Sequence, residues 1–367
     1  MKVLMVSKAL VVGAYQRKLE EIAAQPEVQL TCVVPPSWRL EGRDQPLERA
    51  YLRGYRLRVE PIRFNGSFHL FYFPTLGRVL REERPDLLHV DEEPYNLATF
   101  LAFLSARRGG AAPIFFTWQN LLHRYPPPFV WMERWVLRTA RYALLGNQEA
   151  GRVLAAKGYR GPSRVVPQFG VDPRVFTPGP ARARARVIGY VGRLVEEKGV
   201  GDLLEAVAGL SGDWELRLVG SGPLAAAIPA RATALGIGPR VTLAGAIPST
   251  QMPEALRALD LLVLPSRTRP NWKEQFGRAL VEAMACGVPV VGSSSGEIPH
   301  VIGDAGLVVP EGDVQALRQA LGRLLEDADL RRALAAAGRQ RVLAHFTQQR
   351  IAQQTVEVYR EVAGARA

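Results

Sequence analysis

The chain has 367 residues, of which 47% are hydrophobic and 22% are charged, and this composition excludes a disordered chain and predicts about two folded domains. Its two cysteines, Cys32 and Cys286, are too few for a disulfide framework or a zinc cluster and fit a reducing interior. The formal net charge of +12 fits an anionic partner, such as a phosphorylated substrate, an acidic membrane surface or nucleic acid, and an arginine-rich genome composition explains it equally well.

Short aliphatic and β-branched runs alternate with longer helical patterns along the chain, which predicts βαβ units and parallel sheets covered on both faces. The runs of the first half lie at 2–7, 28–34, 86–90, 113–118, 142–146 and 164–168. The runs of the second half lie at 186–192, 214–220, 240–245, 261–265, 288–293 and 306–310. The first run is broken by Lys8 and lacks a small-residue cleavage site, so we expect a buried strand there and no signal peptide.

The segment 176–187, FTPGPARARARV, is rich in Pro, Gly, Ala and Arg and has no hydrophobic period, which indicates a linker. We therefore expect an N-terminal domain at 1–178 and a C-terminal domain at 186–346. No stretch has the ~18 uninterrupted apolar residues of a membrane span. We expect a soluble, cytoplasmic protein, with peripheral contact at the inner face of the membrane as the alternative.

Aromatic residues and arginines are mixed in two stretches, AYLRGYRLRV at 50–59 and FVWMERWVLRTARY at 129–142. On a helix Trp131, Trp135 and Arg138 share a face, which allows contact with a membrane surface. We favour core aromatics with arginines at their edge. Basic residues are otherwise scattered and no recognised nucleic-acid module is present, so we expect no nucleic-acid partner.

A loop with two cations, Arg193 and Lys198, follows the run at 186–192. Ligands of open α/β sheets bind at the carboxyl ends of the strands. Two cations there can bind a diphosphate and stabilise charge that develops on a leaving group. Glu196 and Glu197 could pair with both, so on spacing alone a solvated charged loop is the alternative.

Two glycines, Gly220 and Gly222, flank Ser221 after the run at 214–220. Glycine lets the backbone approach a ligand closely. A plain turn explains so short a pattern equally well.

The segment EQFGRALVEAMACGVPVV places two carboxylates, Glu274 and Glu282, on either side of a predicted helix start at Gly277. A helix N-terminus offers free N–H groups and partial positive charge to an anion. At ~1.5 Å per residue the two carboxylates lie up to ~12 Å apart. Because carboxylates accept hydrogen bonds from vicinal hydroxyls, Glu282 could hold a ribose and Glu274 a hexose on either side of a diphosphate. A capping acid plus a solvated helix glutamate is the alternative for such a pair taken alone.

The motifs occur together and in order, as VIGYVGRLVEEKG, LVGSGPL, LAGAIPSTQMPEALRALDLLVLPS and EQFGRALVEAMACGVPVVGSSSGEIPHVIGDAGLVVPEGD. This block, within 186–313, resembles the donor-binding half of the family 4 retaining glycosyltransferases, which have the GT-B fold. The resemblance implies an α/β architecture in which two Rossmann-like β/α/β domains face each other across a cleft. The stretch 347–367, expected to be an amphipathic helix, is also similar to the family and would cross back to the N-terminal domain. The first half of the chain matches the family only in layout.

The resemblance implies a catalytic role for three of the matching residues. Arg193 and Lys198 would bind the donor diphosphate and stabilise it as it leaves, and Glu274 would contact the transferred sugar. Members of the family work without a metal, and no D-x-D follows a predicted strand in this half. We therefore expect no metal and no cofactor, with a nucleotide diphosphate sugar as the co-substrate.

The resemblance also implies donor contacts. Phe276 and Gly277 would offer backbone N–H groups to sugar or phosphate, and Glu282 would bind the ribose. Gly222 would allow close approach to the donor. Gly13, after the first predicted strand, stands where many relatives have two glycines and would approach the donor phosphate or the acceptor.

Three acids, Asp91, Glu92 and Glu93, follow the run at 86–90 and could orient an acceptor hydroxyl or act as a base. We favour helix initiation by Glu93 and Pro94, since acids stabilise the first turn of a helix. Glu92 is kept as an acceptor-side candidate.

The family often carries a histidine after the strand predicted at 113–118, near the reacting sugar. This chain has Trp118 and Gln119 there, and its histidine, His123, comes a few residues later. Gln119 is therefore the second acceptor-side candidate.

Together these features predict a retaining hexosyltransferase of polysaccharide biosynthesis or a related pathway. It would move a hexose from a nucleotide diphosphate sugar to a hydroxyl of a glycan, a lipid-linked or a small-molecule acceptor. In the front-face attack that the resemblance favours, the departing phosphate takes the acceptor proton. A GT-B sugar-nucleotide epimerase and a non-catalytic nucleotide-sugar-binding subunit are the alternatives. A Rossmann dehydrogenase is a poor interpretation because no G-x-G-x-x-G follows a predicted strand.

Overall fold

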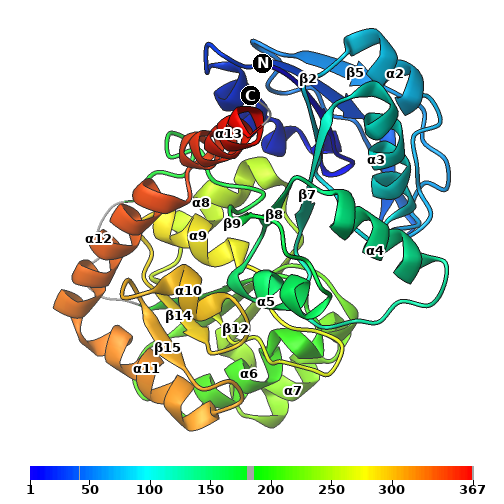
Figure 1. The fold of residues 1–367 in the computed structure, drawn as a ribbon. Coiled ribbons are helices and arrows are strands. Elements are labelled where there is room, and N and C mark those ends of the chain that lie inside the picture. The colour runs from blue at the N-terminus through cyan, green and yellow to red at the C-terminus, as the bar shows by residue number, and fades with distance from the viewer. Residues whose placement is uncertain (41, 180–185, 366–367) are drawn as a thin grey trace. The chain divides into compact units, whose positions relative to one another are not determined.

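The computed structural model describes residues 1–40, 42–179 and 186–365, which form two compact units (Figure 1). The first unit comprises Met1–Gly170 together with Gln348–Ala367, and the second comprises Val171–Thr347. Half of the linker predicted at 176–187 lies outside the described residues. Each unit is built on a parallel sheet, so the predicted α/β class with two Rossmann-like domains is confirmed.

The first unit is built around a seven-stranded sheet in the order β5-β2-β1-β6-β7-β8-β9, in which every neighbouring pair is parallel. The order reverses between β1 and β6, so the loops that follow these two strands diverge at the carboxyl edge of the sheet. The strands are β1 (Lys2–Val6), β2 (Gln29–Val34), β5 (Arg56–Val59), β6 (Leu87–Val90), β7 (Ala112–Thr117), β8 (Tyr142–Leu145) and β9 (Ser163–Val165). Outside this sheet, β3 (Ser37–Leu40) and β4 (Arg43–Pro46) pair as an antiparallel hairpin.

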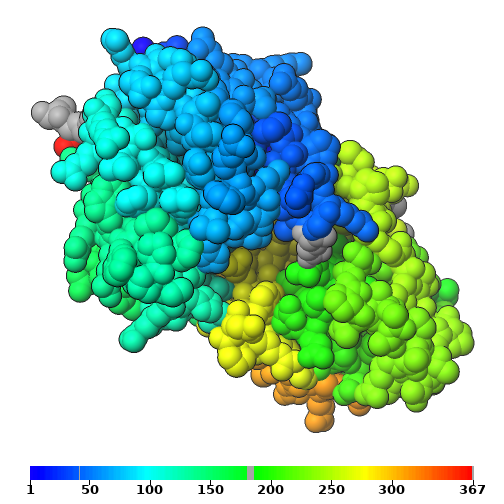
Figure 2. Space-filling view, turned by 90° about the vertical axis from the view of Figure 1, so that its right-hand side faces the viewer, coloured from blue at the N-terminus to red at the C-terminus, as the bar shows by residue number. Residues whose placement is uncertain are grey.

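The five inner strands of this sheet, from β2 to β8 in the strand order, bury both of their faces, as their continuous apolar sequences require. In β1, Leu4 and Val6 join the core beneath one layer of helices, while Val3 and Met5 join the core beneath the other. This alternation is the period of two that a strand imposes on its side chains. Figure 2 shows one face of the unit, where segments from the first hundred residues (blue to cyan) form a continuous surface.

The helices of the first unit are divided between these two cores. One core contains residues of α1 (Arg17–Ala23) and α13 (Gln348–Gly364). The other contains residues of α2 (Leu76–Glu83), α3 (Leu97–Gly109), α4 (Phe129–Thr139) and α5 (Gln148–Ala156). Two short 3₁₀ helices, η1 (Ala9–Val11) and η2 (Gly13–Gln16), precede α1.

The second unit has a six-stranded parallel sheet in the order β12-β11-β10-β13-β14-β15, with the reversal between β10 and β13. Its strands are β10 (Val187–Val191), β11 (Glu215–Val219), β12 (Val241–Gly245), β13 (Leu261–Leu264), β14 (Val290–Ser293) and β15 (Leu307–Val309). Its α-helices are α6 (Val200–Ala208), α7 (Ile228–Ala234), α8 (Met252–Arg257), α9 (Arg278–Ala285), α10 (Ile298–Ile302), α11 (Val314–Glu326) and α12 (Ala328–His345). Its 3₁₀ helices are η3 (Glu196–Lys198), η4 (Pro223–Ala226), η5 (Gly238–Arg240) and η6 (Ser249–Gln251).

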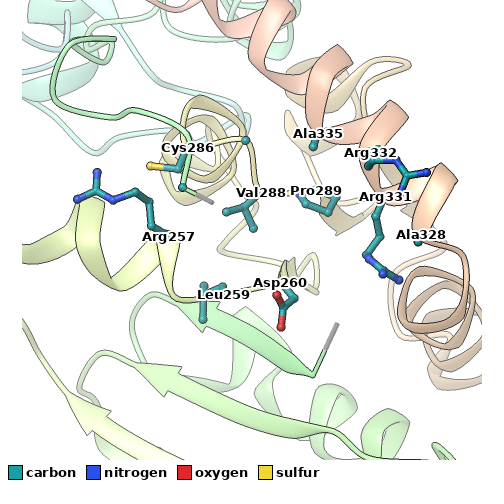
Figure 3. Close-up of a pocket in the computed structure, with 12 residues that line it drawn as sticks. Arg257, Leu259, Asp260, Cys286, Val288, Pro289, Ala328, Arg331, Arg332 and Ala335 are labelled. Atoms are coloured by element: carbon teal, nitrogen blue, oxygen red, sulfur yellow. The ribbon is translucent and has the colours of Figure 1, made fainter. Parts of the chain in front are cut away.

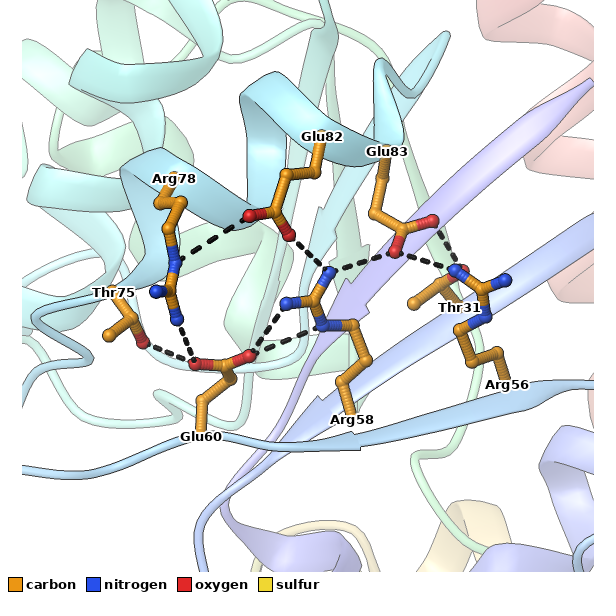
Figure 4. Close-up of polar contacts among 8 residues, drawn as sticks. All are labelled: Thr31, Arg56, Arg58, Glu60, Thr75, Arg78, Glu82 and Glu83. Atoms are coloured by element: carbon orange, nitrogen blue, oxygen red, sulfur yellow. Dashed lines mark hydrogen bonds and ion pairs between the residues drawn. The ribbon is translucent and has the colours of Figure 1, made fainter.

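All of the predicted runs form strands, but the sequence did not predict β3, β4 or β5. β5 is the edge strand next to β2, and its sequence, RLRV, alternates arginine with aliphatic residues. Arg58 pairs with Glu60 at 3.0 Å and with Glu82 at 2.8 Å, and Arg56 pairs with Glu83 at 3.0 Å (Figure 4). Charged side chains on an edge strand discourage pairing with another chain. The same arginines hide the strand from a pattern based on hydrophobicity.

The expectation that the aromatics of α4 lie in the core is wrong for Trp131, which is 62% exposed. Trp135 is half-buried and meets Phe100 of α3 edge-on, with ring centroids 5.2 Å apart. Met132 and Val136 fill the core-facing side of this helix, which leaves Trp131 available for a surface contact. Among the described helices none is long and apolar enough to cross a membrane.

The C-terminal helix α13 packs on the first unit through Ile351, Val358 and Val362, the face that the sequence predicted to be apolar. A polar contact accompanies this packing. The Tyr359 hydroxyl lies 2.7 Å from Nδ1 of His89, a buried residue of β6. Burial lowers the pKa of His89 to about 4, against the opposing effect of Asp91.

The low pKa of His89 predicts a loss of stability in acid. In the unfolded chain this imidazole has an ordinary pKa of about 6.5, so between pH 6.5 and about 4 the unfolded state binds more protons than the folded state. The contribution of His89 therefore decreases as the pH falls through this window, by about 3 kcal/mol in total. Urea unfolding of the wild type and of His89→Gln across this range isolates the effect, because the variant lacks the imidazole.

We expect the wild type to lose stability relative to His89→Gln as the pH falls from 6.5 to about 4. An NMR titration of the imidazole provides the direct check. A His89 midpoint near 6.5 would contradict the assignment.

Candidate active site

A pocket of about 410 Å³ lies at the carboxyl edge of the second sheet. Its walls come from the loop after β10, from the segment between β12 and α8, and from the loop after β13 together with the start of α9. The reversal of strand order between β10 and β13 leaves room for a ligand at this edge. The glycines and charged residues that line the pocket are Gly192, Arg193, Lys198, Glu274, Gly277, Arg278 and Glu282.

The central contact of this pocket is an ion pair between Lys198 and Glu274. Lys198 Nζ lies 2.5 Å from Glu274 Oε2, and the same oxygen accepts a hydrogen bond of 2.8 Å from Ser266 Oγ. Because Glu274 is only 6% exposed, water screens this pair less than it screens a pair on the open surface. The ring centroid of Trp272 lies 4.9 Å from Lys198 Nζ and gives the lysine a cation–π contact.

Two glycines let the loops around this ion pair approach each other. A Cβ atom on Gly199, which has φ +69°, would lie 1.9 Å from the carbonyl oxygen of Pro265. A Cβ atom on Gly296, with φ +55°, would lie 2.0 Å from the carbonyl oxygen of Glu274. The same carbonyl accepts a hydrogen bond of 3.1 Å from Glu297 N. The loop that carries Lys198 and the loop after β14 are therefore both packed against the segment that carries Glu274.

The helix α9 begins where the sequence predicted, after Gly277, which adopts a left-handed conformation with φ +85°. Its first turn lines the pocket and contributes partial positive charge there. Glu282, one turn further on, is 5% exposed and accepts a hydrogen bond of 2.6 Å from Arg278 Nε. Burial raises the pKa of Glu282, and Arg278 opposes this shift.

The remaining predicted residues of the second unit are Arg193, Gly222 and Phe276, and they do not all line the pocket. Arg193 lines the pocket. Gly222 packs against the loop after β10, because a Cβ atom there would lie 2.4 Å from the carbonyl oxygen of Leu194. The ring of Phe276 meets Phe346 edge-on at 5.8 Å, so this side chain belongs to the packing of the unit. The donor contact predicted for Phe276 concerns its backbone and stays a prediction.

Glu92 lies where the strand order of the first sheet reverses, two residues after the end of β6. It is 3% exposed, and Lys8 binds both of its oxygens, with the backbone N–H donating to Oε1 at 2.7 Å and Nζ paired with Oε2. Lys8 Nζ also lies 4.9 to 5.4 Å from the ring centroids of Trp38, Phe68 and Phe71. Burial raises the pKa of Glu92, and the lysine opposes this shift.

The expectation that Glu93 initiates a helix is wrong. The helix α3 begins at Leu97, and Asn96 occupies the preceding position. The Glu93 carboxylate instead binds the end of β7, where it accepts hydrogen bonds of 2.6 Å from Thr117 Oγ1 and 2.7 Å from Trp118 N. Burial raises its pKa to about 7. The sequence could not show this, because the partners of the carboxylate lie more than twenty residues further along the chain.

The remaining two candidates, Gln119 and Gly13, make contacts within the first unit. Gln119 is 6% exposed, and its Nε2 donates to the hydroxyl of Tyr125 at 3.0 Å. Gly13 donates its N–H to Glu48 Oε2 at 2.7 Å, and a Cβ atom there would lie 2.9 Å from Ala50. The acceptor and donor roles of these residues stay predictions.

The second unit has another pocket, of about 160 Å³, at the amino ends of β13 and β14 (Figure 3). Its polar groups serve the fold. Asp260 accepts a hydrogen bond of 2.9 Å from Val187 N, and Arg331 donates one of 2.6 Å to the carbonyl of Leu324. Burial raises the pKa of the Cys286 thiol to about 11, so the thiol stays protonated near neutral pH. In the part of the chain that the structure describes, no group of three or more His, Cys, Asp or Glu is placed to hold a metal ion.

Comparison with known proteins identifies the family of the chain. The family model for glycosyl transferases group 1 matches residues 175–341, and that for the glycosyl transferase 4-like domain matches residues 12–168. The 2-deoxystreptamine N-acetyl-D-glucosaminyltransferase of Streptomyces fradiae is 30% identical over 316 residues, which cover 77% of this chain and 73% of that one. The chain belongs to the group 1, family 4 glycosyltransferases.

Other members of this glycosyltransferase family share about half of the chain. The MMP alpha-(1->4)-mannosyltransferase of Mycolicibacterium hassiacum is 38% identical over 205 residues, 53% of this chain and 47% of that one. The chain spans about half the length of this relative. The solved Anabaena Alr3699/HepE in complex with UDP has a TM-score of 0.76 and 18% identity, over 98% of this chain and all of that one. At that identity the likeness shows the fold alone, which is the GT-B fold.

The sequence did not predict a role in the site for three residues, Ser266, Trp272 and Gly296. Ser266 lies two residues after the end of β13, a position from which side chains of a parallel sheet reach its ligand edge. Trp272 lies in the loop before Glu274, and Gly296 lies in the motif SSSGEIP. Their positions were visible in the sequence, but the contacts they make were not.

The close approach of Gly199 to Pro265 predicts a large cost for a side chain at this position. Gly199→Ala adds a Cβ atom 1.9 Å from a backbone oxygen and also keeps a positive φ, so we expect a loss of about 3 kcal/mol or more. Gly212→Ala is the matched control, because Gly212 has φ +83° and a Cβ atom added there would meet nothing within 4 Å. We expect the control to lose about 1 kcal/mol, the cost of the left-handed backbone alone. Urea unfolding measures both, and equal losses would contradict the proposed loop contact.

Proposed function

We propose that the chain is a glycosyltransferase that moves a hexose from a nucleotide diphosphate sugar to an acceptor hydroxyl, with retention at the anomeric carbon and without a metal ion. The observation that carries the proposal is the pocket in which Arg193, Lys198, Glu274 and the N-terminus of α9 come together. Membership of the family and the named activities of its relatives support the same reaction class.

In this proposal the donor diphosphate binds Arg193, Lys198 and the first N–H groups of α9. These groups stabilise the negative charge that grows on the diphosphate as it leaves, and each such donor typically contributes ~10²–10³ in rate. Glu274 accepts hydrogen bonds from hydroxyls of the transferred sugar, and Glu282 accepts them from the ribose. Arg278, which holds Glu282 from one side, fixes the orientation of that carboxylate.

The bond between the anomeric carbon and the diphosphate oxygen breaks while the acceptor oxygen forms its bond on the same face of the sugar. The acceptor proton passes to the departing diphosphate, so no protein nucleophile is needed. The side chains then contribute chiefly by orienting the reactants and stabilising charge.

The acceptor would be a hydroxylated molecule bound by the first unit, with Glu92 and Gln119 as its candidate contacts. The relatives named for D-inositol 3-phosphate and for 2-deoxystreptamine act on hydroxylated rings, which supports an acceptor of this kind. GDP-mannose is named for two relatives and UDP for solved structures of similar fold, so guanine and uracil donors are the first to test. We place the reaction in the cytoplasm.

Donor binding is the first test of this function. In thermal unfolding with EDTA present, we expect UDP- or GDP-sugars to raise the midpoint, because a ligand that binds the folded state alone stabilises it. Each sugar is compared with its bare nucleoside diphosphate and with the other base. No shift with any donor would contradict the function, and a shift that requires added Mg²⁺ would contradict metal independence.

Transfer itself is tested with Lys198→Ala and Glu274→Ala. We expect each to reduce turnover by at least ~10²-fold, because each removes a group proposed to act in the transition state. Glu326→Ala, an exposed glutamate of α11, is the control and should keep wild-type activity. Wild-type turnover in either site variant would overturn the assignment, and NMR of the anomeric proton of the product tests retention.

A further inference from the structure

Ser266 has no assigned role in the proposed reaction, yet its side chain is bonded to the site. Its hydroxyl donates to Glu274 Oε2 at 2.8 Å, the same oxygen that Lys198 Nζ contacts at 2.5 Å. Ser266 is fully buried and Glu274 is 6% exposed, so this hydrogen bond is made away from bulk water. A hydrogen bond to a charged group is stronger than one between neutral groups.

Ser266 itself is held firmly. Its carbonyl oxygen accepts a hydrogen bond from Ser293 Oγ at the end of β14, and the next residue, Arg267, donates its N–H to Glu197 O at 2.8 Å. It lies two residues beyond the end of β13, a central strand of the sheet whose residues are all buried. The hydroxyl is therefore a fixed donor on a rigid support, whereas Lys198 reaches Glu274 through a flexible side chain.

The proposed function requires different things of Lys198 and Ser266, which both contact the Glu274 carboxylate. Lys198 has to turn to the donor diphosphate, while Glu274 has to accept hydrogen bonds from the sugar. When the lysine turns away, the carboxylate loses its contact with the positive charge of Lys198. Ser266 can keep its hydrogen bond to Glu274, because its uncharged hydroxyl is not drawn to the diphosphate as the lysine cation is.

We propose that Ser266 is a positioning residue that holds the Glu274 carboxylate in place for the transferred sugar while Lys198 binds the diphosphate. This inference rests on the proposed function. It assigns Ser266 to recognition of the sugar and not to recognition of the diphosphate. Gly296 and Glu297, in the segment after β14, pack against and hydrogen-bond to the carbonyl of Glu274. The side chain of Glu274 is therefore held by a residue after β13 and its main chain by residues after β14.

The test measures the affinity of Ser266→Ala for two ligands, a nucleotide sugar and the matching nucleoside diphosphate, either UDP-glucose with UDP or GDP-mannose with GDP. We expect the sugar nucleotide to bind at least ~10-fold more weakly than to the wild type, as expected for a lost hydrogen bond to a charged group. The nucleoside diphosphate should bind within about twofold of the wild type. Lys198→Ala should instead weaken both ligands, because both carry the diphosphate.

Ser294→Ala is the matched control, since Ser294 is exposed and its hydroxyl accepts only a backbone N–H, from Glu311, among the contacts described for it. It should bind both ligands as the wild type does. A change in Ser266→Ala that affects both ligands equally would indicate a merely structural role and overturn the inference, as would no change in either.

Failure of the proposed function would look different, because the wild type would then bind no nucleotide sugar at all. Should Ser266→Ala not fold, Ser266→Cys keeps the size of the side chain and replaces the hydroxyl by a weaker donor. We expect a smaller loss in this variant that is again confined to the sugar nucleotide. Equal affinity for the sugar nucleotide in Ser266→Cys and the wild type would overturn the inference.

Discussion

The contact of a glycine with a backbone carbonyl of the neighbouring loop is the constraint on which the pocket of the second unit depends. Gly199 makes this contact with Pro265, and Gly296 makes it with Glu274. A Cβ atom at either position would lie within 2.0 Å of that carbonyl oxygen, so it would push the two loops apart together with the groups that they carry. A largely buried ion pair repays its desolvation only when its geometry is well fixed. The charged side chains of Lys198 and Glu274 can therefore pair because the two glycines allow the backbones of their loops to come into contact.

The sequence revealed the fold well because most strands of the two sheets are buried on both faces. Such strands read as short, continuous apolar runs, and each of the predicted runs became a strand. β5 escaped because half of its residues are arginines that pair with glutamates from α2 and from the end of the strand itself. The boundaries of α9 were readable for a different reason, since Gly277 and Gly287 both adopt the left-handed conformation that ends or begins helices.

The site was only partly readable from the sequence. Lys198 and Glu274 were proposed separately, one as a phosphate ligand and one as a sugar ligand, and the structure adds that they touch across 76 positions of sequence. A pair of this kind has no local pattern. For Glu93 a local role was predicted wrongly. Its position before a helix suggested helix initiation, whereas its carboxylate binds the end of β7. Residue types and strand ends indicate where a site lies, whereas partner choice depends on which loops the fold brings side by side.

The C-terminal helix α13 has a consequence for how the chain is organised. The second unit is continuous from Val171 to Thr347, and these two residues pair with each other in a parallel bridge. Its two ends therefore lie together, as in a domain inserted into a loop of another domain. The first unit, by contrast, is complete only when Ile351 and Tyr359 join its core. During synthesis the second unit can finish folding while the first still lacks a helix, and an exchange of the second unit between relatives would leave the hydrophobic core of the first intact.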